Sequence, residues 1–216
     1  MTGWAARVAG AVAAALLGSP TTGVAQSISF AEAEIGKLPK DFETALTGKG
    51  PPGRWEVVGD TTADGGKALA QVSTDATDYR FPLLIRTASV PADVEATIRF
   101  KAVSGKVDQA GGVAVRLLDH NNYYVVRANA LENNVRLYGV VAGRREQFAG
   151  TNAKVTVGEW HTLSLRARGN QFTVSYDGKE LFAAKDDRFG SPGKVALWTK
   201  ADSITRFDRL EIKPLQ

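Results

Sequence analysis

The sequence predicts an all-β protein, a two-sheet antiparallel β-sandwich, and three observations carry this prediction. Apolar and polar residues alternate from residue 55 onward, for example over 94–101 and 161–168, which is typical of half-buried antiparallel strands. Short turns rich in Gly, Asn and Asp join the alternating stretches. No stretch shows the spacing of a long helix, so short strands have to form the core.

The first 25 residues predict a signal peptide. Arg7 precedes a short apolar run at 8–17, and the small residues at 23–25 suit cleavage after Ala25. The run is too short for a bilayer, which takes ~20 residues, although a retained N-terminal anchor helix is the alternative. We therefore expect a periplasmic or secreted protein with no membrane span once the signal is removed.

Residues 26–54 predict an irregular segment that wraps the sandwich. The stretch 48–53 consists of Gly, Pro and one Lys, a composition that interrupts regular structure. One helical turn at 31–35 is the most regular element expected there, and the first strand is expected at Trp55. Residues 55–216 then form the β-sandwich domain, with no internal repeat and no second domain.

The remaining strands follow from the same alternation and from turn chemistry. Asp177-Gly178 separates two alternating stretches and suits the positive φ angles of a type I′ hairpin. Gly169-Asn170 and Ala142-Gly143 lie in similar positions. Besides 94–101 and 161–168, strands are predicted at 55–60, 67–73, 80–86, 110–118, 122–130, 134–141, 144–149, 171–177, 179–185, 193–200 and 204–213.

Composition excludes several classes of function. The chain has no cysteine, which removes thiol chemistry and zinc–thiolate sites. Its net charge is only +4 and its basic residues are scattered, so no nucleic-acid partner is expected. The sequence contains no Gly-x-Ser-x-Gly elbow, phosphate loop or dinucleotide fingerprint. Nothing in it indicates an oligomeric state.

The two histidines do not predict a metal site. His161 lies on the apolar side of its strand, where a hydrogen-bonded core or strand-end histidine is expected. His120 lies in the sequence Asp-His-Asn-Asn, which is typical of a turn. The alternative is a hard-cation site with Asp119 and Asn121 as oxygen ligands, but it lacks further carboxylates. No metal or cofactor is therefore predicted, and a structural calcium ion has no support in the sequence.

Two stretches have the composition of a saccharide site. Residues 108–138 place planar and aromatic side chains at strand positions, and Arg127 and Asn129 project from one face. Such groups pair with hydroxyls and stack on pyranose rings; the alternative is an ordinary polar sheet face. In the second stretch, Trp198 and Lys200 share the outward face of a strand. An exposed Trp198 would suit a sugar platform, whereas packing beneath the N-terminal wrap is the alternative.

These stretches resemble the exported bacterial 3-keto-disaccharide hydrolase domain family, over about residues 40–214. The resembling residues and stretches are Asp108-Gln109, Arg116, Asn122-Tyr123-Tyr124, 127–132, Asp177-Gly178, 193–203 and Phe207-Asp208. That family is similar to concanavalin A-like lectins and glucanases, laminin-G-like domains and family 16 glycoside hydrolases. The resemblance implies a jelly roll of two antiparallel sheets, often with a sugar cleft on the concave side.

The resemblance also implies a set of site residues and a saccharide partner. No Glu-x-Asp-x-x-Glu strand of the family 16 type is present, so paired carboxylates would come from separate elements. The candidate catalytic residues are Asp108, Glu132 and Asp202. The candidate substrate-binding residues are Gln109, Arg116, Tyr124, Arg127, Asn129, Trp198 and Lys200.

Three classes of function follow: a non-catalytic saccharide-binding domain, a hydrolase of glycosides or 3-keto-disaccharides, and a structural envelope protein. In a keto sugar the C–H beside the carbonyl is acidic, so one base and one oxyanion stabiliser could support elimination followed by hydration. Asp or Glu would be the base, with Arg127 or Lys200 as the stabiliser. Convergence of the charged candidates favours an enzyme, an exposed Trp198 favours binding, and a face filled by residues 26–54 favours a structural role.

Overall fold

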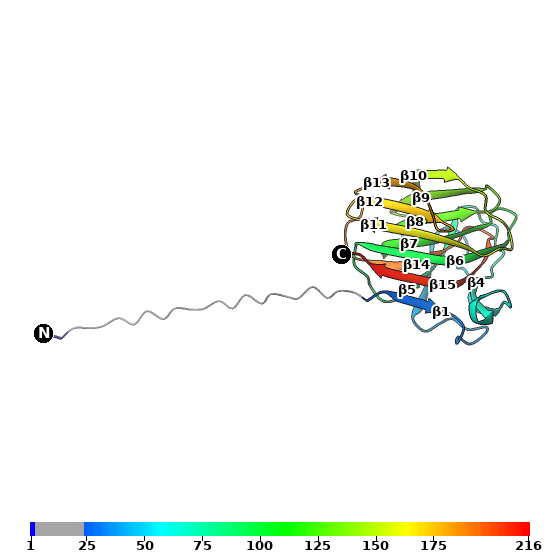
Figure 1. The fold of residues 1–216 in the computed structure, drawn as a ribbon, viewed down its shortest axis with the longest axis horizontal. Helices are drawn as coiled ribbons and strands as arrows, with labels where there is room; N and C mark the ends of the chain where they lie inside the picture. Colours follow the sequence, from blue (N-terminus) through cyan, green and yellow to red (C-terminus); the bar gives the residue numbers. More distant parts are fainter. Residues whose placement is uncertain (3–23) are drawn as a thin grey trace.

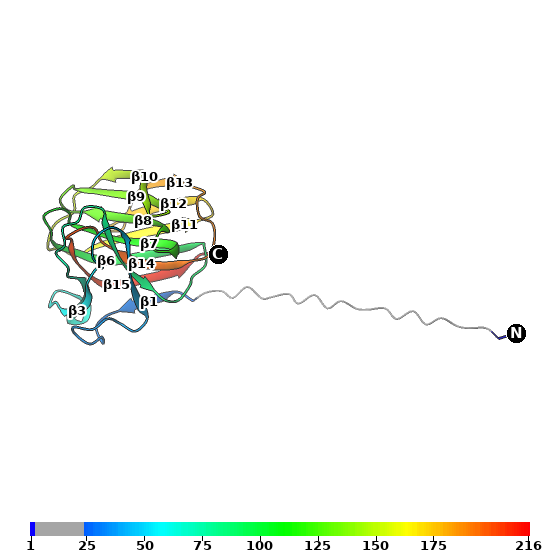
Figure 2. The same cartoon turned by 180° about the vertical axis from the view of Figure 1, so that it is seen from behind.

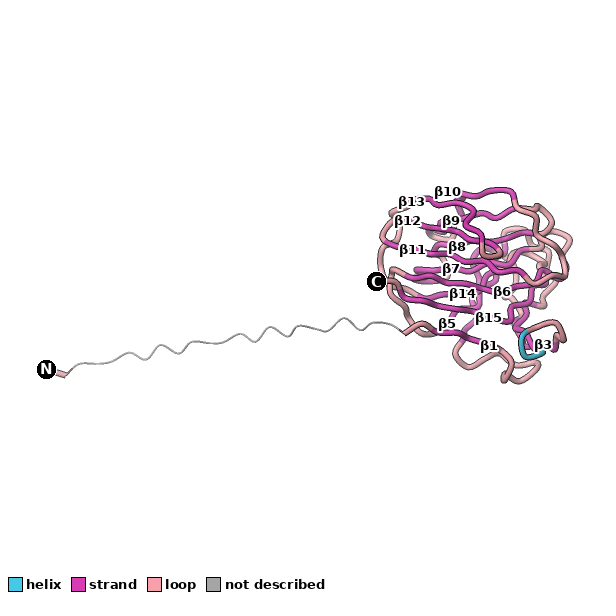
Figure 3. The backbone as a smooth tube through the Cα atoms, in the orientation of Figure 1, coloured by secondary structure: helices cyan, strands magenta, loops and turns pink. Residues whose placement is uncertain are grey.

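Two antiparallel β-sheets pack face to face in the computed structural model, which describes residues 1–2 and 24–216 (Figure 1). The central apolar run of the predicted signal peptide falls in 3–23, outside the described residues. Strands account for nearly all regular structure, and a single 3₁₀ turn at Asp64–Gly66 is the helical element of the described chain (Figure 3). The predicted all-β sandwich is confirmed.

The first sheet has eight strands in the order β13-β12-β11-β6-β15-β4-β3, with β1 added beside β15. Every pairing in it is antiparallel. Its strands are β1 (Gln26–Ser29), β3 (Trp55–Gly59), β4 (Lys67–Gln71), β6 (Val94–Ser104), β11 (His161–Arg168), β12 (Gln171–Tyr176), β13 (Lys179–Lys185) and β15 (Ile204–Pro214).

The second sheet has seven strands in the order β10-β9-β8-β7-β14-β5-β2, again all antiparallel. Figure 2 shows this layer from the other side of the molecule. Its strands are β2 (Phe42–Gly48), β5 (Arg80–Arg86), β7 (Ala110–Asp119), β8 (Asn122–Asn129), β9 (Asn134–Val141), β10 (Arg144–Asn152) and β14 (Lys194–Trp198).

The main core lies between the sheets and uses alternate residues of each strand. Ile98 and Leu165 contribute to this core from the first sheet, and Val126 and Leu197 contribute from the second sheet. All four side chains are fully buried. Burial of this apolar surface is the main favourable contribution to folding. The alternation that predicted the strands therefore also identified the residues facing the core.

A second apolar cluster covers the opposite face of the seven-stranded sheet, which we call the outer face. Phe81, Tyr123, Tyr138 and Trp198 are its large members and are at most 6 % exposed. Because cross-strand neighbours share a face, this cluster defines a continuous apolar floor on the outside of the sandwich. Polar side chains border that floor, and they form the candidate site.

The prediction that residues 26–54 form an irregular wrap is wrong where it excludes strands. This segment contains β1 and β2, so Trp55 does not begin the first strand, and residues 31–35 form turns rather than a helix. β2 pairs with β5 along its full length, from Phe42 to Gly48. Gly48 and Gly50 have positive φ angles, so the turn signals at 48–53 mark where a strand ends and do not exclude one.

The hairpin and histidine predictions are confirmed. Asp177 and Gly178 have φ angles of 47° and 76°, as a type I′ turn requires. His161 is 8 % exposed, its Nδ1 lies 2.8 Å from the Asp177 carboxylate, and its Nε2 accepts a hydrogen bond from the Thr156 amide. Across the described part of the chain, no helix has the length and apolar character needed to cross a membrane.

Candidate functional site

The two predicted clusters lie on one face of one sheet. β8 carries Arg127 and Asn129, β14 carries Trp198, and β7 runs between these strands. Gly112 of β7 pairs with Arg127 on one side and with Trp198 on the other. Because glycine has no side chain, nothing projects from β7 between them. Arg127, Asn129 and Trp198 therefore project from the same face of a single sheet.

Asp108 and Lys200 form an ion pair at one end of this face. Their Oδ2 and Nζ atoms lie 2.9 Å apart, and Asn129 donates a hydrogen bond of 2.8 Å to the other Asp108 oxygen. Lys200 also contacts the exposed Asp78 carboxylate at 3.1 Å. Asp108 is only 1 % exposed, so its carboxylate holds Asn129 and Lys200 in place from below.

Arg127 and Glu132 form a second ion pair beside the first. Arg127 donates from Nη2 to Glu132 Oε2 at 2.7 Å and to the Tyr138 hydroxyl at 3.2 Å, and from Nη1 to Asn134. Asn134 in turn donates to Glu132. The Glu132 side chain is 47 % exposed, whereas that of Arg127 is 6 % exposed. Glu132 is therefore the carboxylate of this pair that a ligand can reach.

The two pairs set the ionisation of their members. Burial raises the pKa of Asp108, although contact with Lys200 opposes that change. Burial alone would lower the pKa of Lys200, but Asp108 and Asp78 outweigh it and raise that pKa. Burial alone would raise the pKa of Glu132, but Arg127 and Asn134 outweigh it and hold that pKa below its usual range. A charged carboxylate thus lies beside fixed cations, an arrangement that can accept a proton and stabilise a developing oxyanion.

Aromatic rings form the floor next to these pairs, but no ring is an open platform. Trp198 is fully buried and stacks on Phe81, with ring centroids 5.4 Å apart. The Arg145 guanidinium lies 5.6 Å from the Trp198 ring and 4.3 Å from that of Tyr138. The expectation of an exposed Trp198 is therefore wrong, because Phe81 and Arg145 pack against it.

Asp202 has a supporting position in the neighbouring loop. Its carboxylate accepts hydrogen bonds from the backbone amides of Lys106, Val107 and Asp108. Burial acts to raise its pKa, but these three donors outweigh it and lower that pKa. Asp202 therefore shapes the β6–β7 loop that carries Asp108. With its oxygens occupied by amides, it is not arranged as a catalytic acid or base.

Arg80 fixes the turn from which Lys200 and Asp202 project. Ala201 in that turn has a φ angle of 48°, a conformation that costs energy for a residue with a side chain. The buried Arg80 guanidinium donates to the Ala201 carbonyl at 2.7 Å and to the carbonyls of Pro51 and Pro52. These bonds hold the turn in place.

Three further predicted residues lie outside the two ion pairs. Arg116 is 1 % exposed and donates to the carbonyls of Ala92, Gly169 and Phe189. Tyr124 projects into the main core. These placements contradict the expected substrate contacts of both residues, because Arg116 ties loops together and Tyr124 faces the opposite side of β8. Gln109 donates to the Gly105 carbonyl, and its contact with substrate stays a prediction.

Sequence reasoning missed four residues that complete the site. Tyr138, Asn134 and Asp78 contact the ion pairs, and Arg145 covers the floor. Strand alternation could have placed Tyr138 and Arg145 on a face. The contact of Asp78 with Lys200 has no sequence signal, because it depends on how two loops meet at the end of the sheet.

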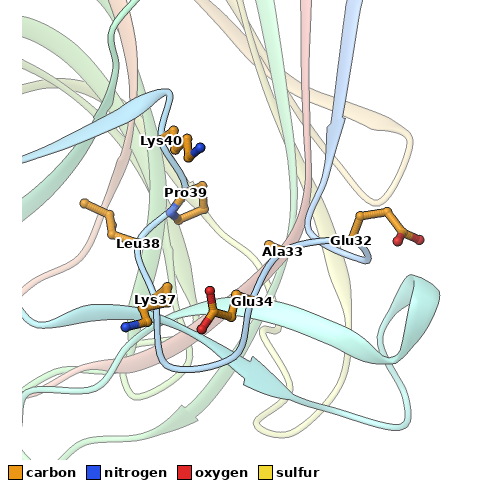
Figure 4. A pocket seen from close by; sticks show the side chains of 7 residues that line it. All are labelled: Glu32, Ala33, Glu34, Lys37, Leu38, Pro39 and Lys40. Atoms are coloured by element: carbon orange, nitrogen blue, oxygen red, sulfur yellow. The ribbon is translucent and has the colours of Figure 1, made fainter.

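The hollow in Figure 4 lies apart from this cluster. Its volume is about 510 Å³, and it is lined by the stretch of chain that connects β1 to β2. Its lining residues are Glu32, Ala33, Glu34, Lys37, Leu38, Pro39 and Lys40. None of them belongs to the outer-face cluster. Among the described residues, no group of three or more His, Cys, Asp and Glu side chains could hold a metal ion.

The sequence matches one protein-family model, and the fold is similar to those of several solved structures. Residues 36–213 match the model of the family described as the 3-keto-alpha-glucoside-1,2-lyase-like domain. Among solved structures, carbohydrate-binding module CBM66 from Bacillus subtilis has a TM-score of 0.63 at 20 % identity, with 80 % of this chain and 95 % of that chain covered. No curated protein matches the sequence.

Two catalytic proteins have the same architecture. The beta-glucanase of Bacillus licheniformis has a TM-score of 0.59 at 10 % identity, covering 90 % of this chain and 100 % of its own. A conserved carbohydrate esterase from Shiga toxin-encoding bacteriophage phi24B has a TM-score of 0.57 at 18 % identity, covering 88 % and 97 %. At these identities the likeness shows the fold alone, a jelly-roll sandwich, as the resemblance implied.

Proposed function

Because the chain belongs to the 3-keto-alpha-glucoside-1,2-lyase-like domain family, we propose that it binds a 3-keto glycoside on the outer face of the seven-stranded sheet and cleaves its glycosidic bond. The observation that carries this proposal is an accessible carboxylate, Glu132, that is paired with Arg127 and feels the charge of a second cation, Lys200, which is itself paired with Asp108. The pKa of Glu132 is lowered and that of Lys200 is raised, so both groups are charged near neutral pH.

The proposed reaction is an elimination followed by hydration. The base takes the proton from C2, and the C–H electrons form an enolate with its negative charge on the C3 oxygen. When the C3 carbonyl re-forms, a double bond forms between C1 and C2, the glycosidic C1–O bond breaks, and the leaving oxygen takes a proton. Addition of water across C1 and C2 then gives the free 3-keto sugar, so the net reaction is hydrolysis.

The site offers residues for the base and for stabilisation of the enolate oxygen. Glu132 is proposed as the base, because a base has to reach the proton it removes and its side chain is half-exposed. Lys200 and Arg127 are proposed to stabilise the enolate oxygen. Asp108 is too deeply buried to touch substrate and is proposed as a positioning residue that holds Lys200 and Asn129.

The test is turnover of a 3-keto α-glucoside by the purified protein and by Glu132→Gln. Loss of a general base lowers the rate by about 10²–10⁴-fold, and exchange of the C2 proton with deuterated water should be lost in parallel. Glu180→Gln, an exposed residue of β13 in the other sheet, is the matched control and should keep full turnover. Full turnover by Glu132→Gln would remove Glu132 as the base.

The second candidate is a non-catalytic saccharide-binding domain. It is supported by the pairing of both site carboxylates, Asp108 and Glu132, with cations, which suits hydrogen bonding to hydroxyls as well as chemistry. A glycan array together with the same turnover assay separates the two candidates. Binding of a 3-keto glycoside without any cleavage or C2 exchange would favour the binding domain.

We also propose that the protein is exported to the periplasm or beyond. The support is the sequence alone: Arg7, the apolar run at 8–17 and the small residues at 23–25. N-terminal sequencing of the protein from the periplasm or the culture medium should begin at Gln26. A retained Met1 in that fraction would overturn the cleavage site.

A further inference from the structure

Arg145 occupies an unusual position at the middle of the outer face. Its guanidinium lies 4.3 Å from the Tyr138 ring centroid, 4.6 Å from that of Phe81 and 5.6 Å from that of Trp198. Its backbone amide donates to the Tyr79 hydroxyl at 2.9 Å. Rings on several sides hold the planar group through cation–π contacts, so its orientation is fixed before any ligand arrives.

Arg145 differs from the other two cations of the site, Arg127 and Lys200, because it is not paired with a carboxylate. Arg127 is paired with Glu132 and Lys200 with Asp108, but no described Asp or Glu forms a salt bridge with Arg145. Its Nη1 atom is buried and makes no hydrogen bond within the described chain. A desolvated donor without an acceptor is unfavourable, and a ligand acceptor would remove that cost.

A second cation on the same side is also uncompensated. Arg136 pairs in register with Arg127, so it faces outward from the neighbouring strand β9. The Arg136 side chain lies over Gly150, a position where an added Cβ would collide with it. Its Nη2 donates a hydrogen bond of 2.9 Å to the side-chain oxygen of the neutral Asn152. Arg136 and Arg145 thus add positive charge to the β9–β10 side of the face, and neither forms a salt bridge with a carboxylate among the described residues.

We infer that the ligand of this face is an anionic saccharide, whose carboxylate or sulfate group binds Arg145 while its ring hydroxyls reach Glu132, Arg127 and Lys200. This inference rests on the proposed function and narrows its substrate class. A guanidinium donates two parallel hydrogen bonds to such a group. The aromatic contacts orient the guanidinium, and Arg145 as a whole is only partly buried. A cation–π clamp with no ligand role is the competing explanation.

The test is a glycan array with matched neutral, uronate and sulfated forms of each saccharide, probed with the full protein. Binding to the charged form should exceed binding to the neutral form by about 10- to 100-fold, the range of a charge-assisted hydrogen bond. Added salt should reduce that preference. The uronate and sulfate arms decide which anion the site takes.

Three variants separate a ligand role from a clamp. Arg145→Gln should lose the preference for charged saccharides, Arg145→Lys should keep part of it, and Arg166→Gln should keep all of it. Arg166 is an exposed residue of β11, which belongs to the other sheet. Thermal melting of each variant tests folding, and Arg145→Lys keeps the charge if Arg145→Gln does not fold.

The outcomes fall into distinct classes. Equal binding of neutral and charged forms by the wild type would overturn this inference and leave the proposed function intact. A charge preference that survives in folded Arg145→Gln would also overturn it. Failure to bind any saccharide, 3-keto glycosides included, would overturn the proposed function and this inference with it.

Discussion

At the scale of single residues, surroundings decide what each carboxylate can do. Asp202 is held by backbone amides and Asp108 by Asn129 and Lys200, whereas Glu132 remains half-exposed. Asp208 in β15 is a fourth case. It is fully buried, pairs with Arg99 and accepts from the Asp64 amide at 2.9 Å, while its Oδ1 has no partner among the described residues.

Asp208 predicts a pH dependence of stability. Burial raises its pKa from 3.8 to about 6, although Arg99 opposes that change. The native state then binds more protons than the unfolded state between these values, so this residue's contribution to stability decreases as pH rises from about 4 to about 6. Relative to the wild type, Asp208→Asn should gain about 1–3 kcal/mol across this window. Urea unfolding at several pH values measures the difference, and a constant difference would contradict the prediction.

The burial of Arg127 changes the effect that its replacement is expected to have on stability. An outward strand residue is expected to affect binding and leave folding nearly intact, but Arg127 is only 5 % exposed and pairs with Glu132. Arg127→Ala should therefore lose saccharide binding and also about 1–3 kcal/mol of stability, because its partners lose their hydrogen bonds. Thermal melting and ligand titration of the same variant check both effects. Binding that stays intact in the folded fraction would make Arg127 purely structural.

At the scale of elements, a residue at positive φ followed by a glycine sets where two of the hairpins turn. The β12–β13 connection has Asp177 and Gly178 at positive φ, and the β9–β10 connection has Ala142 and Gly143 in the same conformation. Such turns match the twist of the flanking strands. The β9–β10 turn in addition places Arg145 over the outer face, because it fixes which residues of β10 pair with β9.

The β12–β13 hairpin predicts the effect of a β-branched residue. Gly178→Val should destabilise the protein by about 1 kcal/mol or more, since valine disfavours positive φ even where, as here, no atom lies within 4 Å of the added Cβ. Gly59→Val is the matched control, because that position is equally open and its φ is not in the left-handed region. Denaturant midpoints of both variants provide the measurement. Equal midpoints would remove the strain argument.

At the scale of the whole molecule, the N-terminal segment is part of the sandwich. β1 joins the eight-stranded sheet at β15 and β2 joins the seven-stranded sheet at β5, so one segment of chain connects both layers. Phe30, between these strands, is 1 % exposed and lies beside Phe42 with ring centroids 6.1 Å apart. Figure 1 shows β1 alongside β15 near the C-terminus.

This integration predicts that the segment contributes to global stability. Phe30→Ala should lower the free energy of unfolding by about 3–5 kcal/mol, because it leaves a cavity in the main core. Ile35→Ala, at a side chain 58 % exposed, should change it by less than about 0.5 kcal/mol. Tryptophan fluorescence in a denaturant titration measures both. A wild-type midpoint for Phe30→Ala would mean that the segment is only loosely attached.

From residue 55 onward the sequence by itself determined the strands and the tight hairpins, because these depend on neighbours in the chain: a period of two, a glycine at positive φ. It also singled out Arg127, Asn129 and Lys200, which meet in the candidate site, but it missed β1 and β2. Tertiary structure decided the rest. The pairing of Lys200 with Asp108, the burial of Trp198 beneath Arg145 and the core position of Tyr124 depend on which strands become neighbours. Contacts between residues far apart in the chain are set by packing of the whole sandwich, and alternation reports a side chain's face but not what covers it.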